Sequence, residues 1–171
     1  QIGHCGYFAS KKVIGTAPIG PSRLFNTYGL AFSRRMTAGD IDRVVRDFGR
    51  AAALATEAGF DALEIHAGHG YLLSQFLSPF TNRRTDEHGG SLENRLRFPL
   101  QVLRRVREEL GPTYPVVAKM NLRDGFRRGL QVEEAVQVAQ ALEAGGAHED
   151  QGLRRQVDVF LSSVESQAID L

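Results

Sequence analysis

Two histidines and a tyrosine stand close together in the segment HAGHGY, residues 66–71. Neutral imidazoles and a phenol can donate hydrogen bonds to a substrate oxygen, and the phenol can also deliver a proton. His66 and His69 could equally be metal ligands, or ordinary histidines of a surface or core. The segment therefore indicates oxygen binding with proton donation from Tyr71, metal coordination, or a purely structural role.

A metal site needs more ligands than this segment offers. Zinc sites use three or four convergent protein ligands. His66 and His69 supply two, and His4 and Glu64 are weak candidates for a third. We therefore expect no metal ion here. The alternative is that both ring N–H groups point at a carbonyl or nitro oxygen of a substrate, where they stabilise developing negative charge.

The composition is typical of a soluble globular protein. The 171 residues are 42% hydrophobic and 24% charged, with a formal net charge of +1. No basic run marks a nucleic-acid surface, and no apolar run approaches the roughly 18 residues of a membrane span. The single cysteine, Cys5, cannot form an internal disulfide and is expected to be a small buried hydrophobe. We expect a cytoplasmic protein without nucleic-acid or membrane partners, and the oligomeric state stays open.

Apolar periodicity predicts helices that alternate with strands. The expected helices cover residues 38–58, 91–110 and 131–144, and the expected strands cover 60–66 and 115–121. The segment before residue 37 reads as loops apart from a strand end at its start, and 67–90 reads as a long connection with one helical turn. Alternation at this spacing implies parallel strands with right-handed crossovers. A barrel of eight such units takes about 250 residues, so the chain predicts an incomplete barrel.

Local signals place the first long helix and the polar face of the first strand. The sequence TAGD, residues 37–40, is similar to a capping box, with Asp40 in place of the usual Glu. In the strand that follows, Glu64 and His66 alternate with Leu63 and Ile65. One polar face behind one apolar face suits a strand that lines a polar cavity.

A longer stretch carries a family resemblance. HAGHGYLLSQFLSPFTNRRTDEHGGSLENRLRF, residues 66–98, resembles the signature segment of the Old Yellow Enzyme family of FMN-dependent oxidoreductases. QIGHCG at the start is similar to that family's third strand, and VVAKMNLRDGF is similar to its fifth. The resemblance covers residues 1–147. It implies an α/β fold, a (β/α)8 TIM barrel, of which this chain holds about strands three to five with their helices.

The resemblance stops at both ends of this region. The family's first two strands have no counterpart before Gln1, and the seventh and eighth strands, whose loops hold a phosphate in many barrels, have none either. Residues 148–171 depart from the family pattern. In that tail Val157, Phe160, Leu161 and Val164 are spaced as in a helix, so we expect a short amphipathic helix there.

The resemblance also implies a reaction. The cofactor is FMN, the reductant is NAD(P)H, and the substrate is an enone or similar activated, α,β-unsaturated alkene. His66 and His69 then hold the activating oxygen, and Tyr71 is the general acid that protonates the α-carbon. Gln1 faces the pyrimidine edge of the flavin, and Lys119 stands where many relatives place an arginine near the flavin N1.

Other interpretations stay open beside this one. The chain could be a truncated, non-catalytic barrel fragment that does not bind flavin by itself, or a hydrolase or lyase on the same barrel. In NRRTDEHGGSLENR, we expect a salt-linked network that fixes the long connection against the next helix, formed by Arg83, Asp86, Glu93 and Arg95.

Overall fold

The centre of the molecule is a parallel sheet. The computed structural model describes residues 1–27, 29–145 and 158–162, the last at the level of the backbone. Three strands pair in the order β5 (Leu63–Ala67), β6 (Val116–Asn121) and β7 (Asp158–Ser162). At the other edge of β5, Ile2 forms a parallel bridge with Ile65. The strand end expected at the start of the chain is therefore present, and the parallel βα order is the one predicted.

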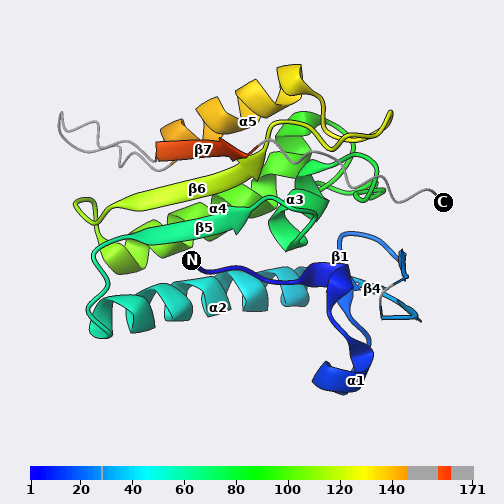
Figure 1. Ribbon diagram of the computed structural model, residues 1–171, viewed down its shortest axis with the longest axis horizontal. Coiled ribbons are helices and arrows are strands. Elements are labelled where there is room, and N and C mark those ends of the chain that lie inside the picture. Colours follow the sequence, from blue (N-terminus) through cyan, green and yellow to red (C-terminus); the bar gives the residue numbers. More distant parts are fainter. Residues whose placement is uncertain (28, 146–157, 163–171) are drawn as a thin grey trace.

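Three long helices accompany this sheet: α2 (Ala38–Glu57), α4 (Leu92–Leu110) and α5 (Val132–Gly145). Figure 1 shows α4 behind β5 and β6, with α2 along the β5 side and α5 along the β7 side. A short helix, α3 (Leu72–Leu77), supplies the helical turn expected in the long connection. The capping box is confirmed, because the Thr37 hydroxyl accepts from the Asp40 N–H while the Asp40 carboxylate accepts from the Thr37 N–H.

The first 36 residues hold more regular structure than the sequence indicated. They contain the 3-10 turn η1 (Gly6–Phe8), the short helix α1 (Lys11–Ile14) and four two-residue strands. These strands are β1 (Ile19–Gly20), β2 (Phe25–Asn26), β3 (Ala31–Phe32) and β4 (Arg34–Arg35). β1 pairs with β4 and β2 pairs with β3. Elements of two residues leave no periodic signal, so composition alone made this segment read as loop.

The prediction of a short helix in the tail is wrong for residues 158–162, the part of the tail that the structure describes. Residues 158–162 form β7, which runs parallel to β6 in a register from Val117↔Asp158 to Asn121↔Ser162. An added strand satisfies the backbone N–H and C=O groups along the second edge of β6. The other residues of 148–171 lie outside the described residues, and the boundary at residue 147 stays a prediction.

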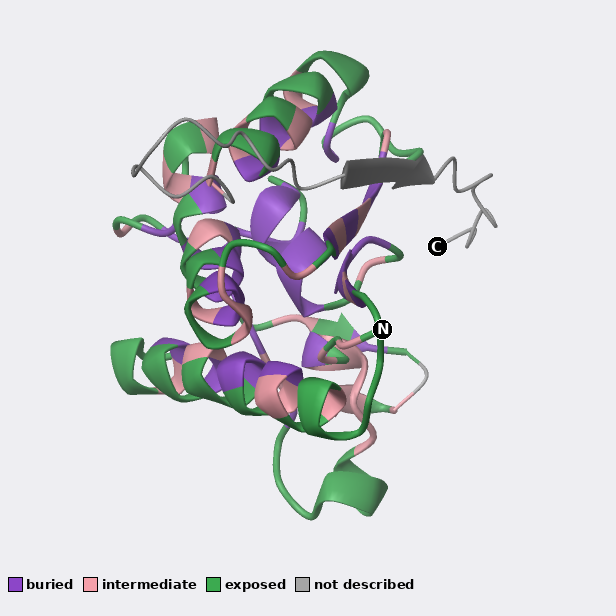
Figure 2. Ribbon diagram, turned by 90° about the vertical axis from the view of Figure 1, so that its left-hand side faces the viewer, coloured by how far each residue is buried: buried purple, intermediate pink, exposed green. Residues whose placement is uncertain are grey.

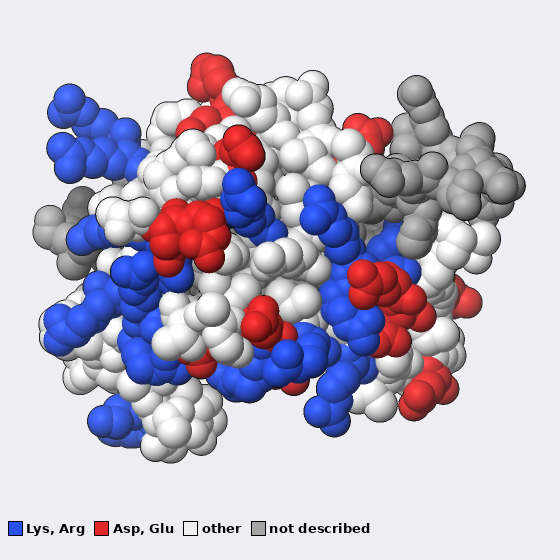
Figure 3. Space-filling model, turned by 180° about the vertical axis from the view of Figure 1, so that it is seen from behind, with Lys and Arg blue, Asp and Glu red and all other residues white. Residues whose placement is uncertain are grey.

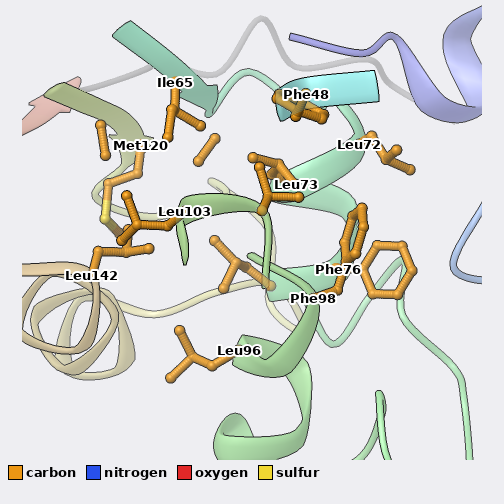
Figure 4. Packing of buried hydrophobic residues seen from close by; sticks show 14 of the residues in the cluster. Phe48, Ile65, Leu72, Leu73, Phe76, Leu96, Phe98, Leu103, Met120 and Leu142 are labelled. Atoms are coloured by element: carbon orange, nitrogen blue, oxygen red, sulfur yellow. The ribbon is translucent and has the colours of Figure 1, made fainter. Parts of the chain in front are cut away.

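The core fills the space between the sheet and its helices. Figure 2 shows the buried residues gathered there, and Figure 4 shows how side chains of β5, β6, α3 and α4 interlock. Ile65 and Met120 enter it from the sheet, and Phe76 and Phe98 pack with ring centroids 4.4 Å apart. Burying each such side chain is worth roughly 1.5–3 kcal/mol. One face of the sheet is thus committed to packing, which leaves the other for polar groups.

The long connection after β5 is fixed by charged groups, but the pairs differ from those expected. Asp86 accepts from Arg84 at 2.6 Å and from Arg35 at 2.7 Å, and Arg83 forms no ion pair among the described residues. Glu93 pairs with Arg97. The buried guanidinium of Arg84 also donates to main-chain carbonyls, including Met36 O at 2.8 Å. Sequence spacing shows which charges are near one another along the chain and cannot show which one folds inward.

Arg95 ties three elements together instead of pairing within the loop. Its buried side chain donates to the Leu77 carbonyl at the end of α3, to the Gly90 carbonyl and to Glu134 of α5.

A second expectation also fails, because Cys5 is exposed and not buried. The Gly89–Gly90 turn is as expected, since a Cβ on Gly89 would lie 2.3 Å from the Arg84 carbonyl oxygen.

The helical side of the molecule carries both signs of charge. Figure 3 shows arginine and lysine interspersed with acidic side chains across this side. On α4, Arg105 pairs with Glu108 at 3.2 Å and also with Glu109. Alternating charge is typical of a solvent-exposed helix, in contrast to the single-sign stripe of a nucleic-acid surface. None of the described helices combines the length and apolar character needed to cross a bilayer.

Candidate functional site

The side of the sheet opposite the core is polar. Glu64 and His66 of β5 alternate with buried apolar residues, and the register His66↔Lys119 places a lysine of β6 beside the histidine. In Figure 1 this side faces the viewer, and no described helix lies in front of it. Three predicted polar groups therefore share one uncovered face, as the alternation along FDALEIH indicated.

The start of the chain joins the same face. Because Ile2 pairs with Ile65, the residues on either side of Ile2 fall in line with Glu64 and His66. The amide nitrogen of Gln1 donates to the Glu64 carboxylate. Two backbone hydrogen bonds, Ile2 N–H to Glu64 O at 2.8 Å and His66 N–H to Ile2 O at 2.9 Å, hold this segment in place. Gln1 is thus positioned on the polar face.

The three residues of the HAGHGY motif come together where β5 ends. The ring centroid of His66 lies 4.8 Å from that of His69 and 5.1 Å from that of Tyr71. His66 is buried, whereas His69 is exposed and Tyr71 is 37% exposed. Active sites of parallel barrels lie at the carboxyl ends of the strands, and this cluster occupies that position.

The surroundings of His66 favour the neutral form of its imidazole. Burial lowers the pKa of its imidazole, and the nearby positive charges of His69 and Lys119 lower it further, against an opposing effect of Glu64. Its Nδ1 is buried and has no hydrogen-bond partner among the described residues. Buried polar atoms are almost always hydrogen-bonded in folded proteins. This nitrogen is therefore an exception among the buried polar atoms of the described residues.

Aromatic side chains from the N-terminal segment stand beside the tyrosine. The turn η1 carries Tyr7 and Phe8, whose ring centroids are 4.2 Å apart. Phe8 in turn meets Tyr71 edge-on at 6.4 Å. This arrangement leaves the Tyr71 ring partly open while one side of it is covered. A half-exposed phenol next to buried imidazole can reach a bound molecule and still exchange protons with solvent.

The remaining polar groups fit a flavin ring. Gln1 keeps its carbonyl oxygen and one amide N–H free of Glu64, which suits the alternating donors and acceptors of a pyrimidine edge. Lys119 is half-buried and has no ion pair among the described residues, so its charge is available to an anionic ring. Both groups lie on the polar face of the sheet. Neither is assigned to the phosphate of such a cofactor.

Two residues that matter for this geometry were not found from the sequence. Asn121 accepts a hydrogen bond from the His69 N–H at 2.8 Å, and Gln75 donates to the Gly70 carbonyl at 2.7 Å. A signal existed for each. Asn121 has the same strand parity as Lys119, and Gln75 is a polar residue inside the apolar run YLLSQFL.

The described residues also bring possible metal ligands together elsewhere. Ligand atoms of Asp86, Glu87 and His88 lie within 4.8 Å of one another. However, Asp86 is already neutralised by Arg84 and Arg35, and two guanidinium groups at this range oppose a cation. The cluster is better explained as an anchor of the loop.

Comparison with known proteins gives one family. The model of the NADH:flavin oxidoreductase / NADH oxidase family matches residues 9–159. Among curated proteins, the 4,4'-dithiodibutanoate disulfide reductase of Rhodococcus erythropolis is 41% identical over 146 residues. That alignment covers 85% of this chain and 36% of the relative, so the chain spans about a third of that protein's length.

Solved structures of the same kind superpose on this chain. A 2-naphthoyl-CoA reductase in complex with 2-naphthoyl-CoA matches with a TM-score of 0.80 and 33% identity, over 85% of this chain and 24% of the other. The Old Yellow Enzyme homologue of Zymomonas mobilis matches with a TM-score of 0.74 and 28% identity, over 83% of this chain and 43% of the other. The arrangement of strands and helices described above is therefore shared with these proteins.

Proposed function

Because the chain belongs to the NADH:flavin oxidoreductase / NADH oxidase family, whose members bind FMN and use NAD(P)H, we propose that it is part of an enzyme that reduces activated, α,β-unsaturated alkenes. The observation that carries the proposal is the convergence of His66, His69 and Tyr71 at the end of β5. When bound, FMN would supply the hydride-transfer chemistry between NAD(P)H and the alkene.

We place the chain within a (β/α)8 barrel of the Old Yellow Enzyme type. In this proposal the segment at Ile2, β5 and β6 are the third, fourth and fifth strands, and the polar side of the sheet is the inner face of the barrel. The support is that the groups on this face are polar and uncovered, while the opposite face is packed against α4. An inner face that is polar at the carboxyl end is where barrel enzymes hold their ligands.

The imidazoles bind the oxygen of the substrate in this proposal. Burial lowers the pKa of His66, which favours its neutral form, and one buried nitrogen of its ring has no partner among the described residues. His69 lies at its edge, so both rings can donate to one carbonyl or nitro oxygen. Such donors stabilise the negative charge that develops on that oxygen when the β-carbon is reduced.

Tyr71 delivers the proton. Reduction of the alkene breaks its C=C π bond and leaves a basic carbon α to the activating group. A phenol is a weak acid, with an ordinary pKa near 10, yet a carbon base of this strength can take its proton. Tyr71 lies close enough to His66 for one substrate to place its oxygen at the imidazole and its α-carbon at the phenol. The partial exposure of Tyr71 allows it to regain a proton from water.

Gln1 and Lys119 hold the flavin ring in this proposal. Their side chains lie on the polar face with His66, and the strand register fixes their spacing. Lys119 stabilises negative charge on the ring by its own charge, without the planar bidentate fork of an arginine.

The test uses a full-length flavoprotein in which this chain is joined to the remaining barrel strands of a relative. We expect His66→Ala and His69→Ala each to lower kcat/KM for an enone by about 10²-fold, the usual effect of removing one donor to a developing oxyanion. His88→Leu is the matched control, because His88 is buried off the polar face and its ring nitrogens have no hydrogen-bond partner among the described residues. Enone kinetics of the two alanine variants that match those of His88→Leu would contradict the proposal.

A further inference from the structure

The turn that follows β5 has an unusual backbone. His69 has φ +56° and Gly70 has φ +72°, so two successive residues lie in the left-handed region. Glycine adopts this conformation freely, whereas a residue with a Cβ does so at a cost and needs support from its surroundings. His69 and Tyr71, two of the proposed site residues, depend on this turn for their direction.

Asn121 supports the turn from β6. Its side-chain oxygen accepts from the His69 N–H at 2.8 Å, across 52 positions of sequence. Its amide nitrogen lies 3.4 Å from Ser74 Oγ and 3.3 Å from a carboxylate oxygen of Asp124. Only an oxygen can face the N–H of His69, and only an N–H can face the carboxylate, so the orientation of the amide is fixed. Asn121 is buried, which protects these bonds from competition with water.

Gln75 supports the same turn from α3. Its amide nitrogen donates to Gly70 O at 2.7 Å and to Cys5 O at 3.1 Å, and its oxygen accepts from the Tyr7 N–H at 3.1 Å. Both N–H groups and the carbonyl are therefore used, and the side chain is 1% exposed. The packing is close, because a Cβ on Gly6 would lie 2.2 Å from the Gln75 oxygen.

We propose that Asn121 and Gln75 are positioning residues that clamp this turn from two sides. Asn121 sets the backbone of His69, and Gln75 sets the peptide before Tyr71 together with the η1 turn that carries Tyr7 and Phe8. The catalytic consequence rests on the proposed function, but the clamp itself is a property of the folded chain.

The two carboxamides make the proposed roles separable. Loss of the Asn121 oxygen releases His69 and should weaken binding of the substrate oxygen. Loss of the Gln75 amide releases the Gly70 carbonyl and the η1 turn, and should impair proton delivery by Tyr71. Each lost bond also leaves a partly buried backbone group without this partner, so its effect is expected at the turn itself.

Amide hydrogen exchange of the 171-residue chain tests the clamp without any cofactor. We expect Asn121→Leu to speed exchange of the His69 N–H by about tenfold, and Gln75→Leu to speed exchange of the Tyr7 N–H by about the same factor, the scale of one buried hydrogen bond. Asn82→Leu is the matched control: Asn82 is also a buried carboxamide, but it donates to Phe76 O and His88 O, away from the turn.

Partial rescue distinguishes positioning from simple loss of packing. Gln75→Glu keeps an acceptor for the Tyr7 N–H but, when ionised, cannot donate to the Gly70 carbonyl. Burial raises the pKa of a carboxyl group, so protonation on lowering the pH restores one O–H donor. We expect the ring signals of Tyr71 in Gln75→Glu to move toward those of the unaltered chain as the pH falls, whereas in Gln75→Leu they should not.

Enone kinetics of the full-length flavoprotein then separate the clamp from the proposed function. If Asn121→Leu raises KM and Gln75→Leu lowers kcat, relative to Asn82→Leu, both stand. If the amides exchange faster but enone kinetics are unchanged, the clamp stands and the proposed roles of His69 and Tyr71 fail. If the His69 and Tyr7 amides exchange no faster than in Asn82→Leu, the clamp is overturned.

Discussion

A neutral imidazole and a half-exposed phenol give the site its chemistry at the scale of single residues. His66 carries a buried ring nitrogen that no described residue satisfies, and Tyr71 stands 5.1 Å from it, ring to ring. The environments of the two side chains differ. Burial lowers the pKa of His66 and favours its uncharged form, whereas Tyr71 keeps access to solvent. Hydrogen bonding and proton delivery can therefore belong to different side chains.

Tyr71→Phe separates these two tasks. Flavin reduction by NAD(P)H needs no proton donor for an enone carbon, so its rate should stay nearly unchanged in the full-length flavoprotein. Enone reduction should slow by about 10² to 10⁴, the usual effect of losing a general acid. Nitroalkenes form stabilised anions, so they should still be reduced but leave as the unprotonated nitronate. Stopped-flow absorbance of each half-reaction measures the two rates.

One outcome would contradict the assignment of Tyr71 as the proton donor. Equal slowing of flavin reduction and enone reduction would make Tyr71 a structural or cofactor-binding residue. Tyr114→Phe is a suitable control, since the Tyr114 hydroxyl donates to the Phe60 carbonyl away from the polar face.

The residues of the motif could be predicted because they are contiguous in sequence, and the residues that hold them could not. His66, His69 and Tyr71 lie within six positions. Asn121 and Gln75 reach them from β6 and α3, and which polar side chain turns inward depends on packing that periodicity does not describe. The same limit explains why Asp86 pairs with Arg84 and Arg35 when the sequence favoured Arg83.

At the scale of elements, α2 shows local signals acting with tertiary packing. The Asp40 carboxylate accepts from the Thr37 N–H at 2.8 Å and from Arg34 at 2.6 Å, at the positive end of the helix. The hydrogen bond from Arg34, with those from Thr37, holds the pKa of Asp40 well below its ordinary value of 3.8. An acid with a depressed pKa stabilises the folded chain above that ordinary value and loses this contribution as the pH falls.

Asp40→Asn tests this linkage. We expect a loss of about 1 kcal/mol in the free energy of unfolding at neutral pH, the scale of a helix cap with its dipole interaction. Below the ordinary carboxyl pKa, Asp40 takes up a proton in the unfolded chain while it stays ionised in the folded chain, so the gap between the two stability curves should narrow as the pH falls. Urea unfolding followed by circular dichroism at pH 7, 5 and 3 measures the gap.

Asp42→Asn is the control, because Asp42 is exposed on the same helix and forms no ion pair among the described residues. A gap between Asp40→Asn and the unaltered chain that stays constant with pH would show that the carboxylate charge contributes nothing.

Elements were predictable where their pattern is long and their partners are local. The helix at 38–57 has a cap and a buried stripe of Ile41, Val44, Phe48 and Ala52, and it was predicted almost to the residue. The strand at 158–162 is five residues long, and its apolar residues fit a helix equally well. It is a strand because β6 offers an edge to pair with, which is a property of the whole sheet.

At the scale of the whole molecule, the chain is a set of βα units whose sheet is packed on one side and polar on the other. The polar side carries His66 together with Gln1 and Lys119, the two residues that we propose for the ring of a flavin. The chain spans 36% of the length of the disulfide reductase of Rhodococcus erythropolis. For flavin binding by the 171-residue chain, the question is therefore whether these residues recognise the ring of FMN or its phosphate.

Comparing FMN with riboflavin answers it, since the two differ only by the phosphate. The groups that we propose for the cofactor, Gln1 and Lys119, are assigned to its ring, and phosphate sites in such barrels come from the loops after the seventh and eighth strands. We expect the 171-residue chain to bind both molecules weakly and equally, and to purify without colour.

Quenching of flavin fluorescence during titration with the chain measures both affinities, and Lys119→Met should weaken both alike because it removes a ring contact. Each charged hydrogen bond to a phosphate is worth about 1.5–3 kcal/mol, or roughly tenfold or more in affinity. A tenfold preference for FMN, or a stoichiometric yellow protein, would therefore place a phosphate site within this chain and contradict the interpretation that it is a fragment unable to hold flavin by itself.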